Sequence, residues 1–218
     1  GSSAIITACW RALMQFYGVE IPTHLLPSLV LSVENEELGI PAGLQDRVIQ
    51  AYEGVVFMDF NRASIEKRGY GIYEPLDPAT LPQVYVAYTT RLSEGTEVFH
   101  NDIRGRWKRG ERDVVSAMYQ WANLAQRVRD MLVKGDGHLI GPLLNENFDL
   151  RRRLYQISPG NIEMVEAARA CGASAKFTGS GGAIVGTYED EAMFEKLKAT
   201  MEPLQMVVLK PQILPPAA

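Results

Sequence analysis

Apolar residues recur every three or four positions in several parts of the chain, which is the spacing of an amphipathic helix. The longest such pattern covers residues 111–133 and steps through Val114, Met118, Trp121, Ala125, Val128 and Leu132. It predicts one long helix. Shorter patterns that end at glycine or proline predict further helices over 6–17, 23–38, 44–52, 138–155, 159–170 and 191–201.

Runs rich in β-branched and aromatic residues lie between these helical patterns and predict strands. They cover residues 54–60, 84–88, 173–177, 183–188 and 205–210. The segment 73–82 contains Pro75, Pro78 and Pro82, and it is predicted to be a loop. This mixed order of helices and strands predicts an α+β fold in two abutting units.

Composition narrows the class of protein. The 218 residues are 46% hydrophobic, and 22 Lys and Arg stand against 26 Asp and Glu, a net charge of −4. This balance argues against a mainly disordered chain and against a broad nucleic-acid surface. No apolar run is long enough for a membrane span. Three scattered histidines suggest no zinc site. Two widely separated cysteines suggest no disulfide framework, so we expect a cytoplasmic protein.

A first candidate for chemistry is Gly1-Ser2-Ser3-Ala4, at the start of the first predicted helix. The serine hydroxyls can accept hydrogen bonds from the free N–H groups of the first helical turn. The same N–H groups and the positive end of the helix dipole favour phosphate, and a serine hydroxyl can ligate Mg²⁺. Taken alone, this segment fits an ordinary capped helix as well as a phosphate site.

A second candidate is the pair Glu34 and Asp46, twelve positions apart. Glu34 lies late in one predicted helix and Asp46 in the first turn of the next, so the turn Pro41–Gly43 can bring both carboxylates into one cleft. One carboxylate could hold a metal ion while the other accepts a hydroxyl proton, and Arg47 could keep Asp46 ionised. The alternative is a solvated acidic helix face.

A third candidate is the segment Lys176–Ala183, which holds three glycines, a serine and a threonine between two predicted strands. Such a segment permits close approach of the backbone to a ligand. It lacks the Gly-Lys-Ser/Thr ending of a Walker A loop, the strand–helix context of a Rossmann loop and a Gly-x-Ser-x-Gly elbow. The run Arg151–Arg153 could meet an anionic substrate or form a solvated helix face.

Together the three segments resemble the motifs of the GHMP kinase superfamily. Gly1–Ala4 looks like the end of that family's phosphate loop, Pro-x-x-x-Gly-Leu-Gly-Ser-Ser-Ala. Glu34 and Gly43–Asp46 look like the metal-binding glutamate and the Gly-x-x-Asp of its sugar-kinase branch. Lys176–Gly182 looks like the third motif, a glycine loop that lines the active site from the C-terminal domain.

Within the superfamily, the segments 37–48, 148–153, 161–166 and 175–183 are similar to plant-type glucuronokinases. This resemblance implies transfer of phosphate from ATP, with Mg²⁺, to the anomeric hydroxyl of D-glucuronate. It also implies two domains, the remainder of an N-terminal ATP-binding domain over residues 1–94 and a ferredoxin-like C-terminal domain over 95–218. The family's first motif and the start of its phosphate loop have no counterpart here. We therefore expect an N-terminally truncated chain that is inactive by itself.

The resemblance also implies a role for each matching residue. The phosphates are cradled by Gly1, Ser2, Ser3 and Ala4, and Mg²⁺ is ligated by Ser3 and Glu34. Asp46 accepts the proton of the sugar hydroxyl, and Gly179, Ser180 and Gly181 close over the site. Candidates for binding the sugar carboxylate are Arg47, Arg153 and Lys176.

Two other functions stay open on the sequence. One is a sugar-1-kinase for galactose, arabinose or fucose, and the other is a non-catalytic binding protein with the same fold. Glu34 and Asp46 favour an enzyme, because a degenerate relative tolerates their loss. The expected partners are ATP and a small sugar.

Overall fold

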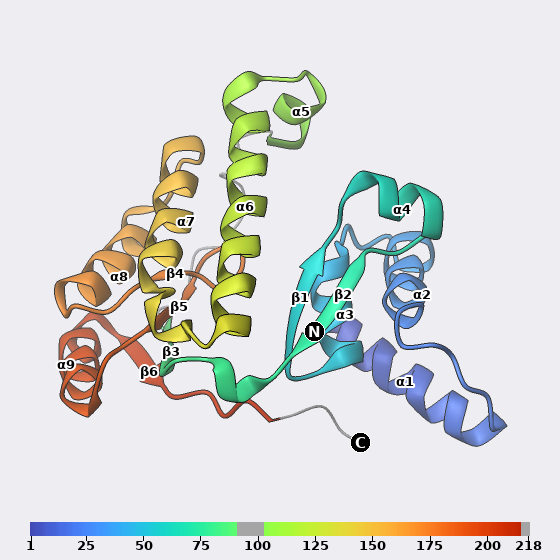
Figure 1. The fold of residues 1–218 in the computed structure, drawn as a ribbon, viewed down its shortest axis with the longest axis horizontal. Helices are drawn as coiled ribbons and strands as arrows, with labels where there is room; N and C mark the ends of the chain where they lie inside the picture. Colours follow the sequence, from blue (N-terminus) through green and yellow to red (C-terminus); the bar gives the residue numbers. More distant parts are fainter. Residues whose placement is uncertain (91–102, 215–218) are drawn as a thin grey trace. The chain divides into compact units, whose positions relative to one another are not determined.

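The computed structural model describes residues 1–90 and 103–214. The chain divides into two compact units, Gly1–Pro78 and Ala79–Gln212 (Figure 1). The domain boundary predicted at residues 94 and 95 lies outside the described residues. Residues 84–89, which the prediction placed in the first domain, form a strand in the sheet of the second unit. No described helix combines the length and the apolar character needed to cross a bilayer.

The first unit is mainly helical. Its helices are α1 (Ser2–Tyr17), α2 (Leu26–Ser32), α3 (Leu44–Tyr52) and α4 (Arg62–Arg68). A π-helical segment, η1 (Val33–Glu37), continues α2, so the helix predicted over 23–38 is present but changes its winding. The strands β1 (Val55–Asp59) and β2 (Ile72–Leu76) form an antiparallel pair.

Strand β2 was wrongly predicted as loop because it contains Pro75. Within the described residues β2 pairs with β1 alone, and Pro75 lies opposite Val56. A proline removes a backbone donor, which an edge strand tolerates because one side of its backbone needs no partner. Helix α4 was not predicted, and the side chain of Asn61 caps its start by accepting from the Ser64 N–H at 2.9 Å.

The second unit is built on a four-stranded antiparallel sheet. Its strands are β3 (Val84–Thr89), β4 (Lys176–Phe177), β5 (Ala183–Thr187) and β6 (Met206–Leu209), in the spatial order β4-β5-β3-β6. The helices before β4 are α5 (Ile103–Lys108), α6 (Arg112–Lys134), α7 (Gly141–Leu154) and α8 (Pro159–Ala170). Helix α9 (Glu191–Met201) connects β5 to β6. Short 3-10 turns cover Pro78–Thr80, Gly137–Leu139 and Glu202–Leu204.

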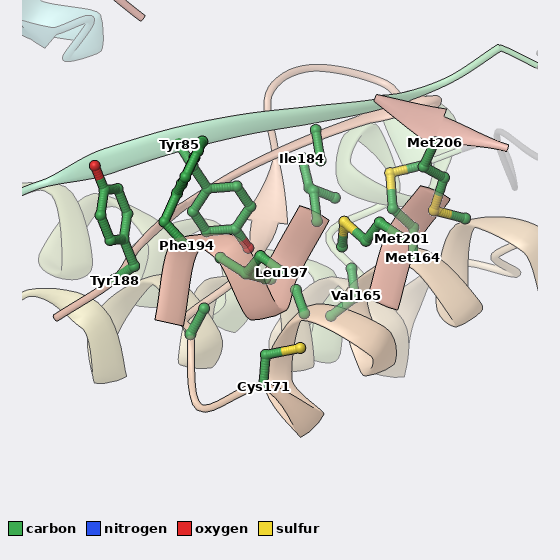
Figure 2. Close-up of a cluster of buried hydrophobic side chains, with 14 of the residues drawn as sticks. Tyr85, Met164, Val165, Cys171, Ile184, Tyr188, Phe194, Leu197, Met201 and Met206 are labelled. Carbon is green, nitrogen blue, oxygen red and sulfur yellow. The ribbon is translucent and has the colours of Figure 1, made fainter. Parts of the chain in front are cut away.

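This order of elements confirms the predicted ferredoxin-like, α+β architecture. Helices follow the first and third strands of the sheet, giving the β-α-β-β-α-β sequence of that fold. Its core lies between the sheet and helices α8 and α9 (Figure 2). Tyr85, Ile184, Leu197 and Met201 are completely buried there. Helices α7 and α8 and strands β4 and β5 therefore form a packed frame for the glycine segment between the two strands.

Candidate active site

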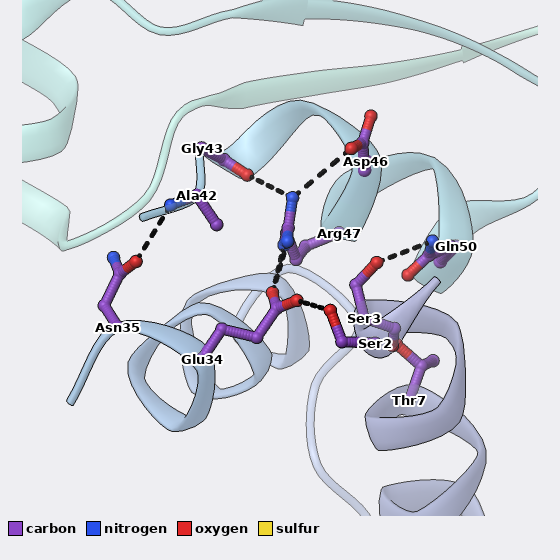
Figure 3. A network of polar contacts seen from close by, with 10 residues as sticks. All are labelled: Ser2, Ser3, Thr7, Glu34, Asn35, Ala42, Gly43, Asp46, Arg47 and Gln50. Atoms are coloured by element: carbon purple, nitrogen blue, oxygen red, sulfur yellow. Dashed lines mark hydrogen bonds and ion pairs between the residues drawn. The ribbon is translucent and has the colours of Figure 1, made fainter. Parts of the chain in front are cut away.

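The first two serines lie inside helix α1 rather than capping it. Gly1 is the N-cap, and no side chain caps the helix. The Ser2 hydroxyl donates to Glu34 Oε1 at 2.6 Å, and the Ser3 hydroxyl accepts from Gln50 Nε2 at 2.9 Å (Figure 3). The expected capping role is therefore wrong. The Ala4 N–H donates to the Gly1 carbonyl at 3.2 Å, and the N–H groups of Ser2 and Ser3 stay available to an outside acceptor such as phosphate.

Glu34 is a completely buried carboxylate between Ser2 and Arg47. Its Oε2 accepts from Arg47 Nε at 2.5 Å and also forms an ion pair with Arg47 Nη2. Burial by itself raises the pKa of this carboxyl, but the hydrogen bonds from Ser2 and Arg47 and the charge of Arg47 outweigh it and lower the pKa. Glu34 is therefore ionised at neutral pH.

The π-helical turn around Glu34 gives this carboxylate its direction. The Leu38 N–H donates to the Val33 carbonyl at 3.0 Å, an i→i+5 bond. The Ile40 N–H then donates to the Glu34 carbonyl at 2.7 Å. Such wide turns often mark functional sites, because the extra residue re-aims the side chains of one turn.

Arg47 lies on α3 and faces the protein's own carboxylates. It is buried, and its Nη1 donates to the Gly43 carbonyl at 3.0 Å and lies 3.4 Å from Asp46 Oδ2. With Nε and Nη2 directed at Glu34, the guanidinium joins the two carboxylates of the predicted pair. The expected contact of Arg47 with a sugar carboxylate has no support in this geometry.

Asp46 differs from Glu34 in being open to solvent, with its side chain 74% exposed. It lies in the first turn of α3, and the turn before it is held by the Asn35 side chain, which accepts from the Ala42 N–H at 3.1 Å. The first unit thus brings together one buried and one accessible carboxylate. The division of this pair into a metal ligand and a proton acceptor stays a prediction.

Glu34 Oε1 and Ser2 Oγ are the two oxygens of this network that could ligate Mg²⁺. Ligand oxygens on neighbouring corners of an Mg²⁺ octahedron lie about 2.9 Å apart, and Glu34 Oε1 and Ser2 Oγ are 2.6 Å apart. No group of three or more His, Cys, Asp or Glu side chains gathers for a metal among the described residues. Ser2, rather than the expected Ser3, supplies the hydroxyl beside Glu34.

In the second unit, the glycine segment is fixed to the start of α8. The Gly182 N–H donates to Asn161 Oδ1 at 2.8 Å. Gly181 has a φ of +148°, and a Cβ there would lie 3.0 Å from Asn161 Nδ2, so a side chain is excluded by both backbone conformation and space. Gly179 and Ser180 are exposed. Gly181 therefore permits a close approach to Asn161, a contact that the sequence did not indicate.

The basic residues near this segment differ in their surroundings. Lys176 is half-buried and its Nζ donates to the Phe177 carbonyl at 2.7 Å; burial and the nearby charge of Arg151 lower its pKa. Arg151 donates to the Gly179 carbonyl at 2.7 Å. Arg153 is exposed and forms no hydrogen bond or ion pair within the described residues. Sequence reasoning considered Arg151 only as part of a basic run.

Comparison with known proteins agrees with these motifs. Residues 128–203 match the family described as GHMP kinases C terminal. The chain is 41% identical to Glucuronokinase 1 of Arabidopsis thaliana, over 98% of this chain and 61% of that protein. It is 46% identical to Probable glucuronokinase 2 of the same plant, over 85% of this chain and 52% of that protein. The chain thus spans only part of the length of these relatives.

Solved kinase structures share the fold at low sequence identity. Streptococcus pneumoniae phosphomevalonate kinase, in complex with phosphomevalonate and AMPPNP, is 19% identical with a TM-score of 0.76, covering 97% of this chain and 68% of that chain. Lactococcus lactis galactokinase complexed with galactose is 14% identical with a TM-score of 0.73, and the match covers 98% of this chain and 65% of that chain. Residues 128–203 thus match the C-terminal domain of the GHMP kinases, and the whole chain is similar to the two plant glucuronokinases and shares the fold of the solved kinases.

Proposed function

We propose that the protein is an ATP-dependent sugar kinase that phosphorylates the anomeric hydroxyl of D-glucuronate and releases glucuronate 1-phosphate and ADP. The observation that carries this proposal is the 41% identity to a plant glucuronokinase, which extends over 98% of the chain and so includes both units. The buried carboxylate Glu34 and the accessible carboxylate Asp46 supply the chemistry that such a transfer needs.

In this proposal the first unit binds phosphate and moves the proton. The N–H groups of Ser2 and Ser3 donate to phosphate oxygens, and Glu34 with a hydroxyl of Ser2 or Ser3 holds Mg²⁺. The bound ion supplies charge neutralisation for the phosphates. The sugar hydroxyl oxygen forms a bond to the γ-phosphorus while the bond to the ADP oxygen breaks, and the hydroxyl proton passes to Asp46.

The second unit contributes a set of donors in the glycine segment. The backbone N–H groups of Gly179, Ser180 and Gly181 donate to no described protein group, and the bond between Gly182 and Asn161 holds the segment in place. Donors that are fixed before a ligand arrives stabilise negative charge without reorganisation. We propose that they act on an anionic group of a bound substrate.

The test is ATP consumption by the full-length protein with Mg²⁺ and each of D-glucuronate, D-galacturonate, galactose, arabinose and fucose. Asp46→Asn lowers kcat on glucuronate by roughly 100- to 10,000-fold and leaves ATP affinity unchanged, because it removes the proton acceptor without touching phosphate contacts. Glu36→Gln, a change at an exposed acidic residue of the same region, serves as the control and keeps full activity.

Other outcomes would contradict separate parts of the proposal. Turnover on neutral sugars alone contradicts the substrate. An active Asp46→Asn variant contradicts the proton acceptor. Binding of ATP without turnover on any sugar contradicts the enzyme itself.

A further inference from the structure

Arg151 on α7 and Lys176 on β4 are two cations without an acidic partner. Arg151 uses one N–H to reach the Gly179 carbonyl, and Lys176 uses one to reach the Phe177 carbonyl. Neither forms an ion pair with a described acidic residue. Other arginines nearby are paired, since Arg152 contacts Glu166 at 2.9 Å and Arg169 contacts Asp149 at 2.6 Å.

The two cations are also held in place and partly shielded from water. The guanidinium of Arg151 lies over the rings of Tyr155 and Phe177, at 5.1 and 5.2 Å from their centroids. Burial, followed by the charge of Arg151, lowers the pKa of Lys176. A half-buried charge without a counterion is unfavourable, and a bound anion beside it removes that cost.

Backbone donors lie on the same segment as the carbonyl that Arg151 contacts. The N–H groups of Gly179, Ser180 and Gly181 have no acceptor among the described residues. Successive free N–H groups in a glycine turn form a concavity that binds anions. The guanidinium of Arg151 and these free backbone donors therefore lie together at Gly179.

We propose that Arg151, Lys176 and the N–H groups of Gly179–Gly181 form an oxyanion site that binds the carboxylate of the sugar acid. This inference rests on the proposed function for the identity of its ligand. A guanidinium can bind a carboxylate through two parallel hydrogen bonds, and Arg151 retains the free donors for this. Of the basic residues considered from the sequence, Arg47 is engaged by Glu34, and Arg153 is exposed without a contact that would orient it.

The experiment measures binding of D-glucuronate, its neutral isostere D-glucuronamide and ATP to the full-length protein by calorimetry. Arg151→Gln raises the Kd for glucuronate roughly 10- to 100-fold, the effect of losing a charge-assisted hydrogen bond, and leaves the Kd values for glucuronamide and ATP unchanged. Lys176→Met acts in the same direction, and Arg151→Lys restores part of the affinity. Arg152→Gln makes the same charge change on the same helix and serves as the control.

Three results would overturn the inference. A raised Kd for ATP in Arg151→Gln identifies the ligand as phosphate. Loss of the preference for glucuronate in Arg153→Gln, and not in Arg151→Gln, moves the contact to Arg153. An unchanged preference in both Arg151→Gln and Lys176→Met, each of which unfolds cooperatively and no less stably than the wild type, removes the site. A wild-type protein that does not bind glucuronate contradicts the proposed function as well, so the two failures are distinguishable.

Discussion

At the scale of single residues, the stability of the first unit depends on Arg47, whose positive charge compensates the buried negative charge of Glu34. The carboxylate of Glu34 is completely buried, and the guanidinium of Arg47 is almost so. A buried ion pair adds little to stability relative to apolar residues, but removal of one partner leaves a charge in a medium of low polarity. We therefore infer that the ion pair between Arg47 and Glu34 mainly fixes the position of the Glu34 carboxylate and adds little to stability.

Arg47→Gln is expected to lower the free energy of unfolding by about 3–5 kcal/mol, because the Glu34 carboxylate loses its counter-charge. Urea unfolding measures this change. The double variant Glu34→Gln, Arg47→Gln recovers part of the loss, since no buried charge remains. Arg62→Gln breaks an exposed pair with Glu66 and serves as the control with no measurable change. Equal effects of the buried and exposed changes would contradict the burial of Glu34.

Lys176→Met is expected to raise the midpoint of thermal unfolding at neutral pH. Burial lowers the pKa of Lys176 in the folded protein below the 10.5 of an unperturbed lysine. The folded state thus binds this proton less tightly than the unfolded state, and the charged lysine opposes folding at every pH below its folded pKa. As pH rises through the folded pKa toward 10.5, the advantage of the variant disappears. If the difference in unfolding midpoint between the variant and the wild type stayed constant or widened as the pH rises, this prediction would be wrong.

The chemistry of the first unit could be anticipated from Glu34 and Asp46, but the geometry between them could not. Their separation along the chain predicted two carboxylates at adjoining helix ends, and Arg47 does contact both. The direction of Glu34 depends on a π-helical turn, which is set by packing and not by the spacing of apolar residues. The sequence also predicted Ser3 beside Glu34, whereas the structure places Ser2 there. Consecutive side chains on a helix differ in direction by about 100°, so a shift of one residue changes which serine faces Glu34.

At the scale of elements, sequence periodicity was reliable where an apolar face is long. Helix α6 was predicted over 111–133 and extends from Arg112 to Lys134. Strand β2 was missed because its proline pointed to a loop, although an edge strand accepts one. Short helices such as α4 carry too few turns to show a period. Elements defined by tertiary pairing are thus the ones that single-sequence reasoning misses.

Gly186 in β5 offers a direct test of the packing of the second sheet. A Cβ at this position would lie 1.7 Å from the Ser174 carbonyl oxygen and 2.7 Å from the Tyr85 ring. Gly186→Ala is expected to lower the free energy of unfolding by about 3 kcal/mol or more, because backbone must move. Gly160→Ala, with nothing within 4 Å of the added Cβ, is the matched control and stays near neutral in chemical denaturation. A harmless Gly186→Ala would contradict this register of the sheet.

At the scale of the whole molecule, the chain contains two units with separate kinds of site chemistry. The first unit holds the carboxylate pair and the start of α1, and the second holds a basic site on a ferredoxin-like frame. The α+β class followed from the order of the predicted helices and strands, and the resemblance to the GHMP kinases followed from three short motifs. The basic site did not follow, since Arg151 is distinguished from its neighbours only by what it contacts.

The most direct test of the account is the structure of the product. The full-length protein is incubated with ATP, Mg²⁺ and D-glucuronate, and the product is examined by ³¹P and ¹H nuclear magnetic resonance. The account predicts a phosphomonoester whose phosphorus couples to the anomeric proton, formed in step with ADP. A phosphate on another carbon, or ADP formed without any phosphorylated sugar acid, would contradict it.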